Sequence, residues 1–443
     1  MLLEFKTANY KSFKEELTFS LIPAQKQKGL DYSIAREKIN KKVYKGLSSA
    51  VIYGANAAGK TNIIGAMDTF KSIIIRGNIR NDEDAKGVNI AAKSLELIPN
   101  NTLIKVQPVS FSIKFIEASM LIEYAFSLDL GFFLDKNYKR KILQETLKIN
   151  ENLVFKRSNE LQIDNLDIIK DYLTEAFKAN QQGAIALAQG SLNDEELFLT
   201  NGFKTIFSVK LSALILNWLS SKFIVVYHSN LLRVVGTLTD PQKNSFYVEE
   251  TINEAAKLFG ITANALGYVN DEETHKVQLC SLVKDKQETA ILPAEIFESY
   301  GTIRFVNIFP LIMKVLLEGG ILIADEFDAS IHPMAVMNII TIFHNDEINK
   351  HHAQLVFNTH NPIFLNANLF RRDEIKFVER DHDTHCSMHY SLSDFGTAGE
   401  NGVRKNEDYM KNYFIDRYGA LDNIDFSSCI TKFIKKQNER NLK

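Results

Sequence analysis

The sequence is poor in the residues that build special scaffolds. It has 3 cysteines, 8 prolines and 1 tryptophan in 443 residues. The cysteines, Cys280, Cys386 and Cys429, are widely spaced, odd in number and not arranged as C-x-x-C, so a disulfide framework is not expected. With 21 glycines and so few prolines, the chain has no room for long flexible linkers or fibrous repeats.

An excess of one charge and a long apolar run are also missing. Lysine and arginine total 52 against 54 aspartates and glutamates, a formal net charge of −2, which excludes a polycation that coats nucleic acid. The richest apolar stretch, 309–323, is interrupted by Lys314, Glu318 and two glycines, and falls short of the ~20 apolar residues of a membrane span. The first residues carry charges and lack the apolar core of an export signal. We therefore expect a cytoplasmic protein without membrane contact.

The first 150 residues have the pattern of strands around one helix. After Lys60, apolar residues recur at steps of three and four, which is typical of a helix packed on a core. Residues 106–149 alternate between apolar and polar, which predicts a meander of antiparallel strands. The other strand-like segments are 2–7, 16–21 and 50–53.

The rest of the chain changes pattern twice. Residues 151–290 are mainly helical in pattern, and the segments 321–324 and 355–358 are apolar enough to be buried parallel strands. These patterns predict an α/β fold in which 1–150 and 291–443 form one discontinuous head with an antiparallel β lobe. The segment between them is predicted as a mainly helical insertion.

A phosphate-binding loop is the strongest chemical signal. Residues 54–61 match G-x-x-x-x-G-K-[ST] and lie between an apolar strand and an amphipathic helix, as this motif requires. Loop N–H groups and the helix N-terminus would bind the β- and γ-phosphates of ATP, Lys60 would add a charge, and the Thr61 hydroxyl would bind Mg²⁺. The alternative is a glycine turn that ends in Lys-Thr by chance. The predicted nucleotide-binding residues are Gly54, Ala55, Asn56, Ala57, Ala58, Gly59, Lys60, Thr61 and Asn62.

Two later strands end in polar side chains. Asp325 and Glu326 follow the first of them, and buried carboxylates need a partner such as a metal ion. Asp325 would hold Mg²⁺, and Glu326 would polarise the attacking water. His360 ends the second strand and would meet the γ-phosphate, because ligands lie beyond the carboxyl ends of parallel strands. Glu326, His360 and Lys60 form the predicted catalytic set; acids that reach solvent and a structural histidine are the alternatives.

The order of these motifs resembles that of ABC-type ATPase heads, as found in SMC-like repair proteins and OLD-type antiviral ATPases. The likeness is greatest to abortive-infection AAA-family ATPases, similar to the ATPase subunits of antiviral systems such as PARIS. It covers nearly the whole chain and implies a P-loop NTPase fold of ABC-head type. Further segments that match are 9–13, 197–199, Trp218, 325–333, 371–375 and 417–420.

The resemblance assigns a signature segment and with it an assembly. Ser299, Gly301 and Thr302 fit S-x-G-T ahead of a helix, which in this family lies against the γ-phosphate bound by a second subunit. One chain has one phosphate loop and one such segment, so a head-to-head homodimer or higher homo-oligomer is implied. From the spacing alone, the segment is equally well a helix cap.

The chain departs from the family pattern at several positions. Tyr300 follows the serine of the signature, where the transporter-type signature has a glycine. Lys11, beside Ser12 in the opening strand motif, replaces the usual arginine and turns a bidentate phosphate contact into a single-point one. Gln107 is the candidate for the glutamine that contacts Mg²⁺. Pro310 lies inside the signature helix and should kink or divide it.

The resemblance implies an ATPase that acts as the sensor or regulatory subunit of an antiphage defence system. The chain after His360 is short and holds no acidic nuclease cluster, so a separate effector protein, a nuclease or toxin, is expected. One alternative is an SMC-like DNA-maintenance ATPase, which would need a heptad-repeat arm that the insertion lacks. The other is a non-catalytic scaffold in which ATP fixes an oligomer.

Three further segments allow more than one interpretation. Residues 26–45 carry seven lysines and arginines against Asp31 and Glu37, so nucleic-acid binding and a solvated surface both remain open. The C-terminal segment 432–443 is a basic, frayed helix. Residues 382–389 hold histidines and a cysteine; a solvated β-hairpin explains them more simply than a zinc site, because strand neighbours point to opposite faces.

Overall fold

The computed structural model describes most of the chain. The described residues are 1–25, 29–81, 94–135, 137–227, 254–255, 257, 265–271, 276–284, 289–397, 402–404, 407–421 and 426–441. Part of the basic run 26–45 therefore lies outside the described residues.

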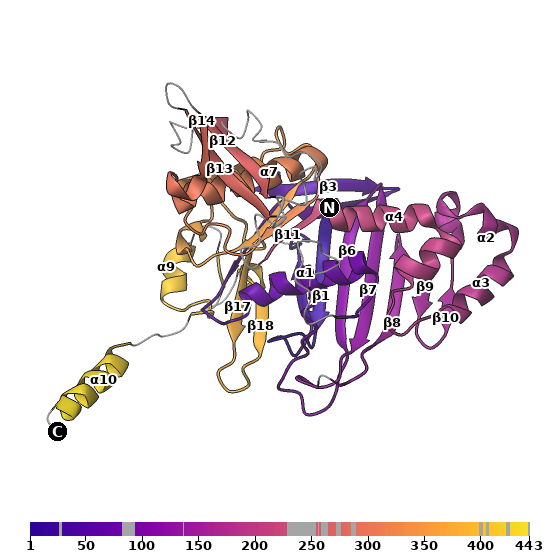
Figure 1. Cartoon of the computed structure of the whole chain (residues 1–443), viewed down its shortest axis with the longest axis horizontal. Helices are drawn as coiled ribbons and strands as arrows, with labels where there is room; N and C mark the ends of the chain where they lie inside the picture. The colour runs from indigo at the N-terminus through magenta and orange to yellow at the C-terminus, as the bar shows by residue number, and fades with distance from the viewer. Residues whose placement is uncertain are drawn as a thin grey trace.

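A six-stranded, largely parallel sheet forms the centre of the molecule (Figure 1). Its order is β11-β15-β16-β5-β17-β18, and every neighbouring pair is parallel except β17 and β18. The carboxyl ends of β5, β15 and β16 therefore meet at one edge, where α/β sheets bind ligands. The strands are β11 (Phe223–Val226), β15 (Ile321–Ala324), β16 (Gln354–Asn358), β5 (Ser49–Tyr53), β17 (Ile375–Arg380) and β18 (Ser387–Ser391).

Alternate residues of this sheet enter two separate cores. Ala50 and Val51, neighbours in β5, belong to different hydrophobic clusters. Helix α1 (Lys60–Arg76) packs in the first cluster, and α7 (Tyr300–Glu318) and α8 (Pro333–Phe343) pack in the second. Burial on both faces explains why the sequence of these strands is almost uninterrupted in its apolar character.

A seven-stranded antiparallel sheet forms a lobe beside α1, in the order β10-β9-β8-β7-β6-β1-β2. The predicted meander is confirmed in β6, β7 and β8, and Phe70 of α1 stacks on Phe126 of β7 with ring centroids 5.4 Å apart. One hydrophobic cluster thus joins the lobe to the central sheet. The strands are β1 (Leu2–Ala8), β2 (Leu17–Ser20), β6 (Val109–Glu117), β7 (Met120–Asp129), β8 (Lys141–Ile149), β9 (Asn152–Arg157) and β10 (Leu161–Ile163).

The predicted helical insertion 151–290 is wrong in its boundary and in part of its content. Strand β9 continues the lobe through a tight turn at Asn150 and Glu151, both with positive φ, and β11 pairs with β15 in the central sheet. A further sheet contains β12 (Ala265–Asp271), β13 (Lys276–Lys284) and β14 (Thr289–Pro293). The described helices of the region are η3 (Leu166–Tyr172), α2 (Glu175–Ala179), α3 (Gln181–Gly190), η4 (Leu199–Phe207), α4 (Val209–Asn217) and η5 (Trp218–Lys222).

A buried carboxylate attaches these helices to the lobe. Glu145 of β8 accepts hydrogen bonds from the N–H groups of Phe198 and Leu199 at 2.7 and 2.8 Å, and from the Tyr124 hydroxyl at 2.8 Å. Arg157 lies 3.5 Å away. Burial raises the pKa of Glu145, and these donors partly offset the increase.

Helix α7 is continuous through Pro310, so the proline does not divide it, and the kink stays a prediction. Proline has no N–H to donate to the carbonyl of Val306, and the hydroxyl of Tyr268 in β12 donates to that oxygen instead, at 3.2 Å. By length and hydropathy α7 is the one described helix that could cross a membrane, but 61% of its apolar window is buried inside the fold, as in a core helix.

The C-terminal part adds a hairpin and two helices. Strands β17 and β18 are antiparallel and enclose the His/Cys segment, which confirms the predicted hairpin. Helix α9 (Tyr409–Phe414) packs on the second core, whereas α10 (Phe426–Asn441) stands clear of the body in Figure 1. A hairpin of β3 (Ile34–Ile39) and β4 (Lys42–Leu47) precedes β5.

Candidate nucleotide-binding site

The phosphate loop joins β5 to α1, as the motif predicts. A Cβ atom at Gly54 would lie 2.3 Å from the carbonyl oxygen of Val378, and one at Gly59 would lie 2.6 Å from Oγ of Ser387. Gly59 also has φ 115°, in the region that favours glycine. Both glycines are therefore required by the contacts of the loop with β17 and β18.

Lys60 lies under this loop with 5% of its surface exposed. Its Nζ donates to the carbonyl oxygens of Gly54 and Ala55 at 2.7 and 2.8 Å. Ser12 reaches the start of α1 from the opening strand motif, since Nδ2 of Asn62 donates to its Oγ at 2.8 Å. The predicted loop residues thus surround one fixed positive charge.

Two hard oxygen ligands face each other at the loop. The Thr61 hydroxyl donates to Oδ1 of Asp325 at 3.1 Å, and Asn358 Nδ2 donates to the same oxygen at 2.5 Å. A hydroxyl and a carboxylate are the ligand types that Mg²⁺ prefers, so these residues fit the metal predicted for this site. Asp325 and Asn358 come from the adjacent strands β15 and β16.

Asn358 and Arg304, which the sequence patterns did not identify as site residues, hold the main chain of Asp325 and Glu326 in place. Oδ1 of Asn358 accepts from the N–H of Glu326 at 2.5 Å, and Arg304 of α7 donates to the carbonyl oxygens of Asp325 and Glu326. Arg304 is the one charged residue between Ser299 and Lys314, which is a signal the sequence offers. Glu326 has φ 49° and an exposed side chain. Such strain in a non-glycine residue is characteristic of functional sites.

His360 shares this electrostatic environment. Partial burial and the nearby ammonium of Lys60 lower its pKa, and the carboxylates of Glu326, Asp328 and Asp325 partly offset the decrease. The imidazole is therefore neutral at pH 7. Thr359, its neighbour, donates to Oδ2 of Asp328 at 2.8 Å and ties the end of β16 to the loop after the acids.

The side chain of Lys11 contacts Glu96 and Tyr227, which the sequence did not predict. Its Nζ lies 2.5 Å from Oε2 of Glu96 and 3.0 Å from the hydroxyl of Tyr227. Tyr227 follows β11 and packs on Gly65 of α1, where a Cβ atom would lie 2.8 Å from its hydroxyl. In this structure Lys11 thus pairs with Glu96, and its contact with phosphate stays a prediction.

Gln107 lies in the segment ahead of β6, with its side chain exposed. Its carbonyl oxygen accepts from Nδ2 of Asn9 at 2.7 Å, and among the described residues no recorded contact brings it to Thr61 or Asp325. The strand beside that of Asp325 is β11, which ends at Val226. Metal binding by Gln107 stays a prediction.

Ser299 of the signature segment caps α7 at the surface, whereas Gly301 and Thr302 are buried. Oγ of Ser299 accepts from the N–H of Thr302 at 3.2 Å, the predicted helix cap. A Cβ atom at Gly301 would lie 2.1 Å from the carbonyl oxygen of Ser330, so this glycine permits close packing on the loop after the acids. Ser299 is exposed, and the neighbouring Tyr300 has 64% of its surface exposed.

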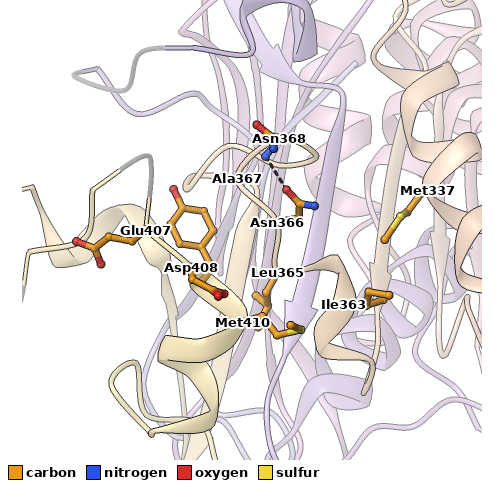
Figure 2. A pocket seen from close by; sticks show the side chains of 10 residues that line it. Met337, Ile363, Leu365, Asn366, Ala367, Asn368, Glu407, Asp408 and Met410 are labelled. Atoms are coloured by element: carbon orange, nitrogen blue, oxygen red, sulfur yellow. Dashed lines mark hydrogen bonds between the residues drawn. The ribbon is translucent and has the colours of Figure 1, made fainter.

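Two cavities border these elements. A 520 Å³ groove lies between α8, the turn η7 (Pro362–Phe364) after His360, and α9 (Figure 2). Met337, Ile363 and Met410 line its apolar part, and Asp408 lies at its edge. A second cavity of 210 Å³ separates loop residues 55–58 from the turn of the β17–β18 hairpin.

The phosphate loop, the acid pair at the end of β15 and the strand order define a P-loop NTPase. A family model described as "AAA domain, putative AbiEii toxin, Type IV TA system" matches residues 49–366, and the chain belongs to this family. The predicted P-loop NTPase fold with an antiparallel β lobe is confirmed, and its assignment to the ABC-head type stays a prediction.

Solved structures and curated proteins complete the comparison. The chain is 12% identical to the SMC head domain from Thermotoga maritima, with a TM-score of 0.36 and coverage of 88% of this chain and 98% of that one. It is 12% identical to an SMC head bound to the C-winged helix domain of ScpA, with a TM-score of 0.38 and coverage of 89% and 99%. No curated protein matches the chain.

Proposed function

We propose that the chain is a Mg²⁺-dependent ATPase. The observation that supports this most is the hydrogen-bonded network of Thr61, Asp325, Asn358 and Glu326 directly beside the phosphate loop. Loop N–H groups and Lys60 bind the β- and γ-phosphates, and Thr61 and Asp325 hold the metal. When bound, Mg²⁺ neutralises charge on the phosphate oxygens as the γ-phosphoryl group leaves.

Glu326 is the general base in this proposal. Asn358 and Arg304 fix its main chain on both sides, which leaves its carboxylate exposed at the end of β15 and free to accept a proton from water. His360 is neutral and can donate one N–H to a γ-phosphate oxygen without adding a second positive charge beside Lys60.

We propose further that two chains complete each site head to head. Ser299 is exposed at the start of α7, and Ile296, Phe297 and Tyr300 expose 62%, 48% and 64% of their surfaces around it. Exposed apolar side chains grouped near a helix N-terminus suit a contact with a partner chain and its bound phosphate. Ser299, Gly301 and Thr302 would cap the nucleotide held by Lys60 of the other copy.

The biological part of the proposal follows from the family. Its description names a putative AbiEii toxin and a type IV toxin–antitoxin system. We propose that the ATPase works in the cytoplasm as a sensor or regulatory subunit in antiphage defence, similar to that of PARIS, and that its hydrolysis cycle holds or releases a separate effector. In this proposal ATP is more than a structural ligand of a scaffold.

A complementation experiment tests the composite site. Lys60→Ala and Ser299→Arg should each abolish steady-state phosphate release. An equimolar mixture should recover roughly one quarter of the wild-type rate, because half of the dimers are mixed and each mixed dimer has one intact site.

The double variant Lys60→Ala/Ser299→Arg mixed with Ser299→Arg is the matched control and should show no recovery, because none of its dimers has an intact site. No recovery in the mixture, with Ser299→Arg still binding ATP, would show that Ser299 does not act on a partner's nucleotide. A wild-type oligomer that binds ATP but releases phosphate no faster than Lys60→Ala would identify a scaffold instead.

A further inference from the structure

The β3–β4 hairpin has one packed face and one exposed face. Ala35 and Ile39 of β3 pack with Met1 and Leu3 of the lobe, and Tyr44 of β4 lies against the same cluster. Because strand residues alternate between faces, Arg36, Lys38 and Lys45 must lie on the opposite side of the hairpin. The pairing of β3 with β4 therefore places three cations of the basic run 26–45 on one face.

The exposed face concentrates positive charge at a cost in stability. Arg36 is directly opposite Lys45 in the antiparallel register, and Lys38 lies two positions further along the same strand. All three side chains are exposed, as is that of Lys41 in the turn. Like charges directly opposite each other destabilise a strand pair, so folding alone does not account for this arrangement.

Neighbouring acids do not neutralise this face. Glu37 lies on the packed side, where its charge raises the pKa of the Met1 amino group against the larger effect of burial. Glu151 pairs with Lys42 at 2.5 Å. Within the described part of the chain, no ion pair is recorded for the remaining four cations, Arg36, Lys38, Lys41 and Lys45.

We propose that this face of the hairpin binds the phosphate backbone of double-stranded nucleic acid. Its outer face has no aromatic side chain on which an unpaired base could stack, since Tyr44 is on the other side. Val43 is its one exposed apolar residue, too little to enter a membrane interface. Closely spaced cations with one exposed apolar neighbour and no aromatic neighbour suit a regular polyanion.

The hairpin and the nucleotide site lie at opposite ends of one strand. Strand β4 leads directly into the start of β5, and the phosphate loop follows the end of β5. Five residues of extended chain separate them by about 17 Å. Duplex binding therefore uses residues distinct from those that bind ATP, and it can be tested without disturbing hydrolysis.

The test is fluorescence anisotropy of the full chain with a labelled duplex of about 30 base pairs over a series of salt concentrations. The variant Arg36→Gln/Lys38→Gln/Lys45→Gln should weaken binding at least about tenfold and reduce the slope of log K against log salt by about 2 to 3. Each single change should reduce the slope by about 1. Double-stranded RNA should bind in the same way, because the contacts are to the backbone.

The matched control replaces three exposed lysines outside the hairpin, Lys105, Lys204 and Lys210, by glutamine. It should leave the slope of log K against log salt unchanged. Lys60→Ala should bind the duplex like wild type. Unchanged affinity and slope in the hairpin triple variant, or equal losses in the control, would overturn the proposal. Dependence on the same three residues for vesicles of phosphatidylserine but not for the duplex would assign the face to a membrane surface instead.

Discussion

The two edges of the parallel sheet use the same polar residue types in different ways. At the amino edge, Gln354 of β16 accepts from the N–H of Leu2 at 2.6 Å and donates to the carbonyls of Leu2 and Leu47 at 2.9 and 2.8 Å. At the carboxyl edge, Asn358 of the same strand bonds to Asp325 and to the N–H of Glu326. The Gln354 amide thus connects β16 to Leu2 and Leu47, whereas the Asn358 amide positions Asp325 and Glu326.

The carboxylates of the two edges differ in the same way. Glu374 at the amino edge is fully buried and accepts from Ser49 at 2.9 Å and from the N–H of Arg371 at 2.7 Å. Glu326 at the carboxyl edge is exposed, and its backbone is strained. A carboxylate whose side chain is fully hydrogen-bonded inside the fold, such as Glu374, stabilises the structure. A carboxylate whose backbone is held in place and whose side chain is exposed, such as Glu326, can take part in a reaction.

The largest expected effect separates these two carboxylates. Glu326→Gln should lower kcat for ATP hydrolysis by about 10²- to 10⁴-fold, because it removes the base, and should leave ATP affinity and thermal stability close to wild type. Phosphate release and nucleotide binding measure this. Glu374→Gln is the control and should lower stability with little change in kcat. Normal turnover by Glu326→Gln would remove Glu326 from the mechanism.

The two amides of β16 give the next largest contrast. Asn358→Ala should lower kcat about 10²-fold, because Glu326 and Asp325 both lose a hydrogen bond that positions them. Gln354→Ala should instead reduce the free energy of unfolding by about 2 to 4 kcal/mol, because three buried backbone groups lose their partner. Denaturant melts and kinetics on both variants test the distinction; equal kinetic losses would show that the edges are not functionally different.

Arg304 should have a smaller effect at the carboxyl edge. Arg304→Lys keeps the charge but cannot reach both carbonyl oxygens with one planar group, so we expect kcat to fall about tenfold at unchanged KM. Lys314→Arg, on the same helix and paired with Glu318 at the surface, is the control. A change in KM alone would indicate a role in nucleotide binding.

The last prediction concerns a histidine at neither edge. Nε2 of His389 in β18 is buried, and burial, together with the nearby charge of Lys376, lowers the pKa of this histidine from 6.5 to about 3. The unfolded chain therefore binds a proton that the native chain does not, and stability is lost as the pH falls from 6.5 toward 3, by at most about 1.4 kcal/mol per pH unit. His389→Phe should flatten this dependence in denaturant melts, and an unchanged slope would contradict it.

Local sequence patterns predicted much of the site. The loop 54–61 and the acids Asp325 and Glu326 were found because each follows an apolar strand directly. Asn358 lies 33 residues from Asp325, and Arg304 lies 21 residues before it, so their contacts depend on the strand order and on the packing of α7. The Lys11–Glu96 pair likewise joins residues 85 positions apart. Such contacts have no local periodicity to reveal them.

The fold was predicted where one period extended over many residues. Strands β6 to β8 alternate over long segments and were found, whereas β9 and β10 are short and were included in the helical region. The three-residue β10 offers too little alternation to identify a strand. The order of the central sheet follows from crossovers between distant segments, which hydrophobic patterning does not report.

The substituted hydrogen bond in the middle of α7 links the helix to a distant sheet. The carbonyl oxygen of Val306 accepts a hydrogen bond from the hydroxyl of Tyr268 in β12 rather than from an N–H of the helix itself. Arg304, which donates hydrogen bonds to the carbonyl oxygens of the acid pair, lies two residues earlier in the helix. A displacement of β12 would leave the carbonyl oxygen of Val306 without this donor. The small sheet is thus linked, through two nearby residues of α7, to the acid pair of the proposed catalytic site.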